Sequence, residues 1–186
     1  VIVASGSTYV HPNIPGITLE KVKTVSDVEN HRVPVGEQVV VCGGGIVGLE
    51  CAVMLGMEGK QVTVIDQIPL EKFADGMPVF NHIELNHQLE KYGVSLVGGQ
   101  RITAFGENGV ETVDASGEKR QFAGDTYVLA LGVKPDNRLA QQLLSTYAEG
   151  VYVVGDCVST GRVLADANPM FAVKKLTATQ TTHERQ

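Results

Sequence analysis

The feature that most constrains the fold is a glycine-rich turn, Gly43 to Gly48, which has the pattern G-x-G-x-x-G. It follows directly on the apolar run 38–42, which predicts a buried strand, and leads into residues 49–58, which predict a helix. Gly59 ends this helix, and a second predicted strand follows over 61–66. A strand, glycine turn, helix and strand in this order predict an α/β fold with a Rossmann-like parallel sheet.

Each glycine of the turn has a separate physical role. Gly43 allows a tight turn, Gly45 lets a pyrophosphate approach the backbone, and Gly48 lets the helix pack closely on the strand. The start of the helix then presents unpaired N–H groups and a partial positive charge to the phosphates. The turn therefore predicts a dinucleotide-binding site. A Rossmann methyltransferase, which also uses a Gly-rich turn and a ribose-binding acid, is the alternative.

Asp66, at the end of the second strand, predicts the choice of nicotinamide cofactor. Its carboxylate can accept hydrogen bonds from both hydroxyls of an adenosine ribose, whereas a 2′-phosphate would meet a like charge. At about 4 Å that repulsion is roughly 1 kcal/mol in water and roughly 4 kcal/mol at a dielectric constant of about 20, or about 5-fold to about 1000-fold in affinity. Lys72 is the only base between Asp66 and Asp75. We therefore expect NADH rather than NADPH, the alternative being a solvated Asp at a strand end.

The rest of the chain predicts an antiparallel meander where a helical crossover would be usual. Residues 78–92 predict a helix and 94–97 a third strand. The meander consists of three short runs joined by Gly-containing turns: 101–105, 110–114 and 119–122. The elements predicted after it are a strand at 127–130, a helix at 138–145 and a strand at 151–154.

Composition excludes several other classes of protein. The net charge of −6 and the lack of a basic stripe argue against a nucleic-acid partner. No apolar run approaches the roughly 20 residues of a membrane span, so we expect no membrane partner. The three cysteines, Cys42, Cys51 and Cys157, lack metal-ligand spacing, which predicts buried free thiols in a reducing compartment and no metal site. The expected location is the cytoplasm.

Four motifs resemble those of the two-dinucleotide-fold flavoproteins, the pyridine nucleotide-disulphide oxidoreductase superfamily. The turn and second strand, 43–66, resemble the NAD-binding domain, and Ala130-Leu131-Gly132-Val133-Lys134-Pro135 resembles the A-x-G-x-x-P strand end that closes it. Ala4-Ser5-Gly6 resembles the A-T-G motif, with Ser in place of Thr. Residues 153–157, with Gly155-Asp156, resemble the motif whose carboxylate binds the flavin ribityl chain.

The glycine turn and the resemblance together give two sets of expected binding residues and no catalytic residue. The expected NAD contacts are Gly43, Gly44, Gly45, Ile46, Val47, Gly48, Asp66, Gln67, Leu131 and Gly132. The expected FAD contacts, in a longer parent protein, are Ala4, Ser5, Gly6, Gly155 and Asp156. Glu50 matches an acid that approaches the flavin–nicotinamide contact in relatives, the alternative being an exposed helix Glu.

A narrower resemblance is to the C-terminal part of the old yellow enzyme-like NADH:flavin oxidoreductases and 2,4-dienoyl-CoA reductases. It rests on Gly155-Asp156-Cys157 and on the later segment from Gly161-Arg162 to Asp166-Ala167. It implies that the FAD fingerprint lies before Val1, and that an FMN-binding barrel with an iron–sulfur cluster lies further upstream.

The chain opens on Val1 rather than Met, and the run 1–4 predicts a strand buried on both faces, which needs neighbours. We therefore expect a piece of a longer protein. The expected organisation is a remnant strand and connector of an FAD domain at 1–16, a linker at 17–36, an NAD(H)-binding domain at 37–136, and a C-terminal FAD-domain remnant at 137–186.

The expected function is an electron-entry module, in which NADH passes a hydride to FAD. A nucleotide-binding module that senses or regulates without turnover is the alternative. Because most of the flavin site would lie outside this piece, we expect the piece alone to be inactive. The sequence does not name the final electron acceptor.

Overall fold

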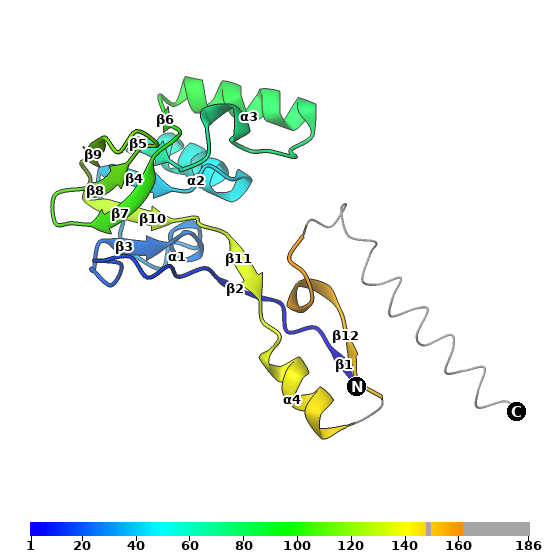
Figure 1. The fold of residues 1–186 in the computed structure, drawn as a ribbon. Coiled ribbons are helices and arrows are strands. Elements are labelled where there is room, and N and C mark those ends of the chain that lie inside the picture. The colour runs from blue at the N-terminus through cyan, green and yellow to red at the C-terminus, as the bar shows by residue number, and fades with distance from the viewer. Residues whose placement is uncertain (148–149, 162–186) are drawn as a thin grey trace, which may run out of the picture. The chain divides into compact units, whose positions relative to one another are not determined.

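The computed structural model describes residues 1–147 and 150–161, which form parts of two compact units (Figure 1). Unit 2 is His11–Gly132 and contains the glycine turn. Unit 1 combines the two ends of the chain, Val1–Val10 and Val133–Gln186. The segment from Arg162 to Ala167, part of the narrower resemblance, lies outside the described residues.

The centre of unit 2 is a five-stranded, all-parallel sheet with the strand order β3-β10-β4-β5-β6. Its strands are β3 (Val22–Thr24), β4 (Gln38–Cys42), β5 (Gln61–Ile65), β6 (Ser95–Val97) and β10 (Thr126–Leu129). Because all five run the same way, their carboxyl ends meet at one edge of the sheet, where open α/β sheets bind their ligands.

Both faces of this sheet are covered, which explains why β4 is an unbroken apolar run. Alternate side chains of a strand point to opposite faces. Val39 and Val41 join the core under the helices, whereas Val40 and Cys42 join the core under the meander. The helices on the first face are α1 (Val25–Glu29), α2 (Ile46–Met57) and α3 (Val79–Lys91).

The predicted meander is confirmed. Its strands are β7 (Arg101–Phe105), β8 (Val110–Val113) and β9 (Lys119–Phe122), and they pair antiparallel. The Phe105 ring packs against the buried Tyr127 ring of β10, with ring centres 6.0 Å apart. The Tyr127 hydroxyl donates a hydrogen bond to the Gly106 carbonyl at 2.9 Å. These contacts attach the meander to the parallel sheet.

Residues 17–36, expected to form a linker, contain a strand and a short helix. Val22–Thr24 form β3, an edge strand paired with β10, and the next residues form α1. Val25 and Val28 of this short helix are each 1% exposed. The Thr24 hydroxyl accepts a hydrogen bond from the Asp27 N–H at 3.2 Å and so caps the helix. The segment is therefore part of the core of unit 2.

Two of the predicted helices also differ in detail. α2 begins at Ile46, inside the glycine turn, with Gly45 as its N-cap. α3 lies within the predicted 78–92, but its apolar Phe80 and Ile83 side chains are 86% and 61% exposed, and its buried residues are Leu85 and Leu89. The apolar spacing of α3 therefore indicates its helical period but not the face that it buries.

The described part of unit 1 contains two short strand pairs, a helix and a 3-10 turn. β1 (Ile2–Val3) pairs parallel with β12 (Tyr152–Val153), and β2 (Ser7–Tyr9) pairs antiparallel with β11 (Val133–Pro135). The other elements are α4 (Arg138–Thr146) and the 3-10 turn η2 (Gly155–Cys157). The expectation that residues 1–4 are buried on both faces is wrong here, because Val3 is buried while Val1 and Ile2 are 69% and 47% exposed.

Candidate functional site

Three glycines of the turn, Gly43, Gly44 and Gly48, lie so close to neighbouring atoms of the protein that a Cβ does not fit. A Cβ on Gly43, where φ is +129°, would lie 2.3 Å from the Ala130 carbonyl oxygen. A Cβ on Gly48 would lie 2.0 Å from the Gly43 carbonyl oxygen, and one on Gly44 would lie 2.8 Å from the Phe73 ring. These distances are too short for any side chain, so the packing of turn, sheet and loop requires glycine here.

Gly45 differs from its neighbours because the space around it is open. A Cβ built there meets no atom of the described residues within 4 Å, and the residue is exposed. Its backbone is extended, with φ of −71°, so neither packing nor strain requires glycine at this position. The open position is where an external group could lie against the backbone, as the sequence predicts for a pyrophosphate.

The N-terminus of α2 points into the same region. Gly45 is its N-cap and supplies no side-chain hydrogen bond, and the first turn carries no acidic residue. The N–H groups of Ile46, Val47 and Gly48 belong to the first turn, which has no intrahelical acceptors for them. This end of the helix therefore offers donors and a partial positive charge to an anion.

Asp66 is held across the turn rather than free in solvent. Its Oδ2 accepts a hydrogen bond from the Gly44 N–H at 2.6 Å, and its Oδ1 accepts one from the Ile68 N–H at 3.1 Å. A carboxylate has about four lone-pair sites, so two remain for further donors. The two hydroxyls of a ribose would match that remaining capacity. Gln67, beside Asp66, is exposed.

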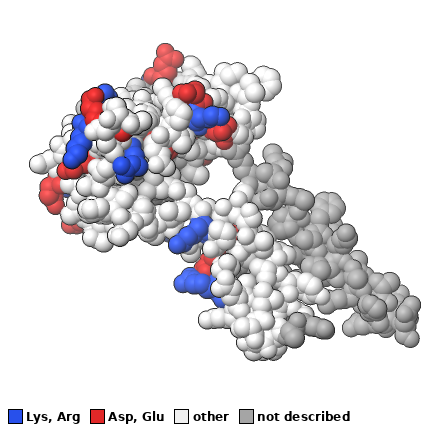
Figure 2. Space-filling view, in the orientation of Figure 1, with Lys and Arg blue, Asp and Glu red and all other residues white. Residues whose placement is uncertain are grey.

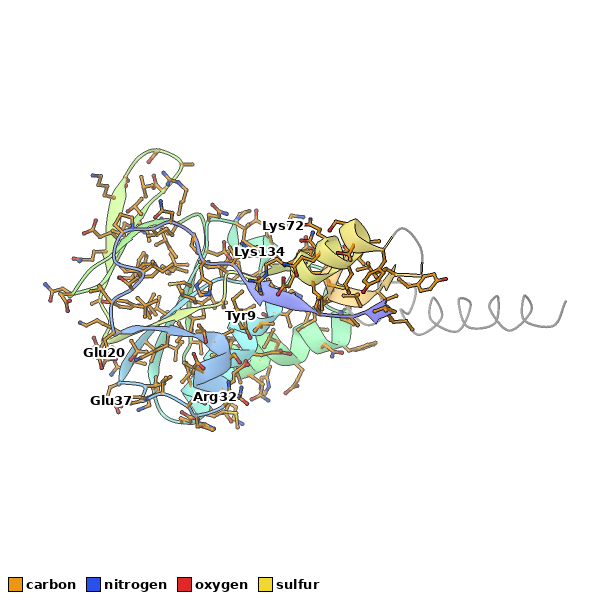
Figure 3. The ribbon with its side chains drawn as sticks, turned by 90° about the horizontal axis from the view of Figure 1, so that it is seen from below. Tyr9, Glu20, Arg32, Glu37, Lys72 and Lys134 are labelled. Atoms are coloured by element: carbon orange, nitrogen blue, oxygen red, sulfur yellow. The ribbon has the colours of Figure 1, made fainter. Side chains whose placement is uncertain are left out.

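The base near Asp66 is engaged elsewhere. The Lys72 ammonium, labelled in Figure 3, lies 3.8 Å from a carboxylate oxygen of Asp75, and its side chain is 60% exposed. No ion pair between Lys72 and Asp66 is present. The arrangement leaves a carboxylate, and not a cation, to meet the ribose position.

The third part of the site comes from the end of β10. The Ala130 N–H donates to the Cys42 carbonyl at 2.9 Å, which fixes this end beside the glycine turn. Leu131 is half-buried, and Gly132 is exposed with φ of +86° and open space around it. The structure thus brings the predicted NAD residues of three adjacent strands, β10, β4 and β5, to one edge of the sheet.

The predicted FAD residues also come together, within unit 1. Because β1 and β12 run parallel with Val3 opposite Val153, the segments that follow, 4–6 and 154–156, leave the same end of the pair. The Ser5 hydroxyl donates to the Asp136 carbonyl at 2.7 Å, and the Asp136 N–H donates to the Gly6 carbonyl at 3.0 Å. Ala4 and Ser5 are exposed, while Gly6, Gly155 and Asp156 are half-buried.

Glu50 is placed on the exposed side of α2. It lines a groove of about 480 Å³ between α2 and α3, together with Val53, Met77, Phe80 and Glu84 among others. The structure therefore shows an exposed helix Glu at the edge of an apolar groove.

The cysteines of unit 2, Cys42 and Cys51, are buried free thiols. Burial raises the pKa of the Cys42 thiol far above its usual range, and the negative charge of Asp66 adds to this effect. Burial, with smaller contributions from Glu29 and Glu58, raises the pKa of Cys51 to about 12. Both thiols stay protonated at neutral pH and pack as small apolar groups, as predicted.

Surface charge, metal ligands and membrane-spanning helices can be described for residues 1–147 and 150–161. The face in Figure 2 carries acidic and basic side chains close to one another, without a basic stripe. Among residues 1–147 and 150–161, no three His, Cys, Asp or Glu side chains are placed to hold a metal ion. No helix within those residues has the length and apolar character to cross a membrane.

Two residues that shape the site were not found from the sequence. The Phe73 ring, 4% exposed, covers Gly44, and Gln100, also 4% exposed, donates its N–H to the Asp66 carbonyl at 2.8 Å. Both lie in loops, where neither residue belongs to a periodic pattern or a motif. Their positions depend on the packed structure.

Known proteins share both the sequence pattern and the fold. Residues 1–178 match the family described as pyridine nucleotide-disulphide oxidoreductase. The chain is 38% identical to bilirubin reductase of Mediterraneibacter gnavus over 84% of its length, and 31% identical to NADH oxidase of Thermoanaerobacter brockii over 93%. It is 29% identical over 97% of its length to nitric oxide reductase FlRd-NAD(+) reductase of Vibrio vulnificus.

Among solved structures, a complex of 2-naphthoyl-CoA reductase with 2-naphthoyl-CoA superposes with a TM-score of 0.78 and 26% identity, over 87% of this chain and 24% of that one. The chain spans 52% of the Vibrio protein, 24% of bilirubin reductase and 27% of NADH oxidase. It therefore matches a part of each of these relatives.

Proposed function

This chain belongs to the pyridine nucleotide-disulphide oxidoreductase family, and from that premise we propose that it is the NAD(H)-binding, electron-entry module of an FAD-dependent NADH oxidoreductase. The observation that carries the proposal is the pairing of an open Gly45 with a fixed Asp66 carboxylate at one edge of the sheet. The first could admit a pyrophosphate, and the second could bind a ribose.

Different residues of unit 2 bind different parts of the NADH molecule. The turn 43–48 and the start of α2 bind the pyrophosphate through backbone N–H groups. Asp66 and the neighbouring Gln67 receive the adenosine ribose, and Leu131 and Gly132 line the other side of the turn. The carboxylate at the ribose position favours NADH over NADPH.

The chemistry comes from the cofactors, since bound NADH supplies a hydride that FAD accepts. The chain's own residues bind the cofactors and orient them, and this role needs no general acid, base or nucleophile. We assign Ala4, Ser5, Gly6, Gly155 and Asp156 to the FAD site of a longer parent protein. A Cβ on Gly6 or Gly155 would meet no described atom within 4 Å, so a flavin could lie against the backbone at both positions. These two segments offer no glycine turn and helix start to bind the flavin pyrophosphate.

A narrower proposal concerns the subfamily and the rest of the parent. We propose an old yellow enzyme-like NADH:flavin oxidoreductase, with an upstream barrel, FMN and an iron–sulfur cluster. Support comes from Gly155-Asp156-Cys157 and from relatives such as bilirubin reductase and NADH oxidase, of which the chain spans about a quarter. The free cysteines Cys42, Cys51 and Cys157 are consistent with a cytoplasmic location.

Anaerobic mixing of the full-length protein with NADH tests the proposal. NADH should bleach the visible absorbance of the flavin. Gly45→Val in the same protein should slow bleaching without loss of bound flavin, because only the NADH site is obstructed. NADH binding without bleaching would instead indicate a nucleotide-sensing module, and binding of S-adenosylmethionine in place of NADH would indicate a methyltransferase.

A further inference from the structure

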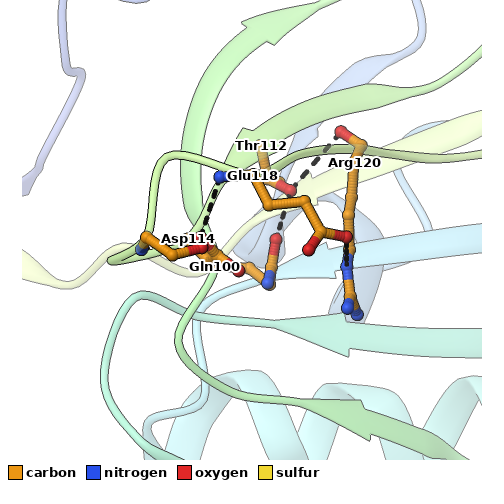
Figure 4. Close-up of polar contacts among 6 residues, drawn as sticks. Gln100, Thr112, Asp114, Glu118 and Arg120 are labelled. Carbon is orange, nitrogen blue, oxygen red and sulfur yellow. Dashed lines mark hydrogen bonds and ion pairs between the residues drawn. The ribbon is translucent and has the colours of Figure 1, made fainter.

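A buried polar pair connects the meander to the loop after β6. The Thr112 hydroxyl of β8 donates a hydrogen bond to the side-chain Oε1 of Gln100 at 2.6 Å (Figure 4). The same hydroxyl oxygen lies 3.5 Å from the Arg120 carbonyl, a longer contact. Thr112 is 0% exposed and Gln100 is 4% exposed. An amide side chain buried to this degree is kept in one position by its hydrogen-bond partner.

The backbone of Gln100 holds the end of β5. Its N–H donates to the Asp66 carbonyl at 2.8 Å, and the preceding Gly99 N–H donates to the Ile68 carbonyl at 2.9 Å. The Asp66 N–H in turn donates to the Val97 carbonyl at 3.1 Å. The backbone on both sides of the Asp66 carboxylate is thus fixed by the loop 97–100.

The path ends at the glycine turn. The Asp66 carboxylate accepts the Gly44 N–H at 2.6 Å. Three hydrogen bonds, joined by the covalent structure of Gln100 and of Asp66, therefore connect Thr112 in the meander to Gly44. All four residues lie in unit 2.

We propose that Gln100 and Thr112 are positioning residues for the adenosine ribose of NADH, so that the meander buttresses the ribose site. This inference rests on the proposed function of unit 2. The Thr112 hydroxyl holds the Gln100 side chain, and the Gln100 N–H holds the backbone carbonyl of Asp66. Together they fix the position of the Asp66 residue at the end of β5. A carboxylate that is already fixed binds a diol without the entropy cost of ordering itself.

Unit 2 contains a matched control for this role. Thr126 of β10 is 3% exposed, and its hydroxyl oxygen accepts the Gly36 N–H at 2.9 Å. Thr126 begins β10, so this hydrogen bond lies at the amino ends of the strands, away from the proposed site. Thr112→Val and Thr126→Val each remove one buried hydroxyl of the same size from a strand.

Calorimetric titration of the chain with NADH and NADPH separates the two positions. Both variants should lower the Tm, because each removes the hydrogen bond of a buried threonine hydroxyl, to the Gln100 side chain in one case and to the half-buried Gly36 N–H in the other. Thr112→Val should weaken NADH binding about three- to tenfold, the equivalent of roughly one ordinary hydrogen bond, and lower the preference for NADH over NADPH. Thr126→Val should leave both affinities unchanged, and Thr112→Ser, which keeps the hydroxyl, should restore the affinity for NADH.

Hydrogen exchange on the unmodified chain gives a second test that needs no variant. NADH should slow the exchange of the Gln100 amide along with the amides of the turn. Equal NADH affinities in the two valine variants, or protection confined to residues 43–48, would overturn the positioning role. Failure of the unmodified chain to bind NADH would instead overturn the proposed function itself.

Discussion

Units 1 and 2 differ most in how much core each possesses. Unit 2 buries side chains on both faces of its sheet, for example Val39 and Val41 on one face and Val40 on the other. In the described part of unit 1 the buried apolar residues are Val3, Ala140 and Cys157. Leu139 and Leu144 of α4, and Tyr147 directly after it, are at least half exposed. A unit with a two-sided core can hold a binding site by itself, whereas one without it depends on further contacts.

Cofactor retention should show the largest difference between the units. The purified chain should bind NADH but retain no flavin, because the described part of unit 1 offers strand ends without the strand, glycine turn and helix that bind a pyrophosphate. Absorbance after gel filtration measures the flavin, and calorimetry of the same sample with NADH confirms that the chain is folded. A stoichiometric yellow flavin that survives filtration would remove the contrast.

Removal of a core leucine should separate the units by stability. Leu55→Ala in α2 creates a cavity at a side chain that is 0% exposed, so we expect unfolding to become about 2–5 kcal/mol easier. Leu144→Ala in α4 makes the same chemical change at a side chain that is 52% exposed, and should change stability by less than about 0.5 kcal/mol. Urea denaturation followed by circular dichroism checks both, and equal losses would show that α4 is packed as tightly as α2.

Asp66→Ala should change the affinities of unit 2 for NADH and NADPH. The loss of hydrogen bonds to a charged acceptor should weaken NADH binding about 10- to 100-fold and bring NADPH to a similar affinity. Glu71→Ala is the control, because it removes the same charge from an exposed side chain of the same loop while leaving the Asp66 contacts and the Lys72–Asp75 ion pair in place. A chain whose preference for NADH survives Asp66→Ala would exclude Asp66 as the ribose acid.

The smallest effect is expected from an exposed ion pair in unit 1. Arg138 binds Asp136 through two hydrogen bonds of 2.8 and 2.7 Å, which lower the pKa of Asp136 to about 2. Because this folded-state pKa is below the unfolded one, the pair stabilises the fold above about pH 4, and the contribution is lost as the pH falls through about 2. In Arg138→Gln the Asp136 titration, followed by NMR, should move toward the ordinary carboxyl pKa with little change in stability at neutral pH. An unchanged titration would show that another group lowers this pKa.

Local sequence patterns predicted the elements that carry their own signal. The apolar run of β4, the glycine turn and the glycine-punctuated meander were all found where expected. β3 was not predicted, because Val22-Lys23-Thr24 is too short to show a period and becomes a strand by pairing with β10, about a hundred residues later.

The candidate site was likewise predictable only where a local motif marks it. The turn and Asp66 follow from a motif whose spacing reflects the geometry of a dinucleotide. Phe73, Gln100 and Thr112 support them from loops and from the meander, and their roles depend on contacts between segments distant in sequence. A single sequence holds no local trace of such contacts.

Unit 2 should bind NADH at Gly45, and calorimetric titration of Gly45→Val with NADH is the decisive measurement. A Cβ at position 45 meets no atom of the described residues within 4 Å, so the variant should keep a Tm close to that of the unmodified chain. The unmodified chain should bind one NADH, and the variant should bind it about tenfold more weakly or not at all, because the side chain takes the pyrophosphate position. Equal affinities in two equally stable chains would contradict the account.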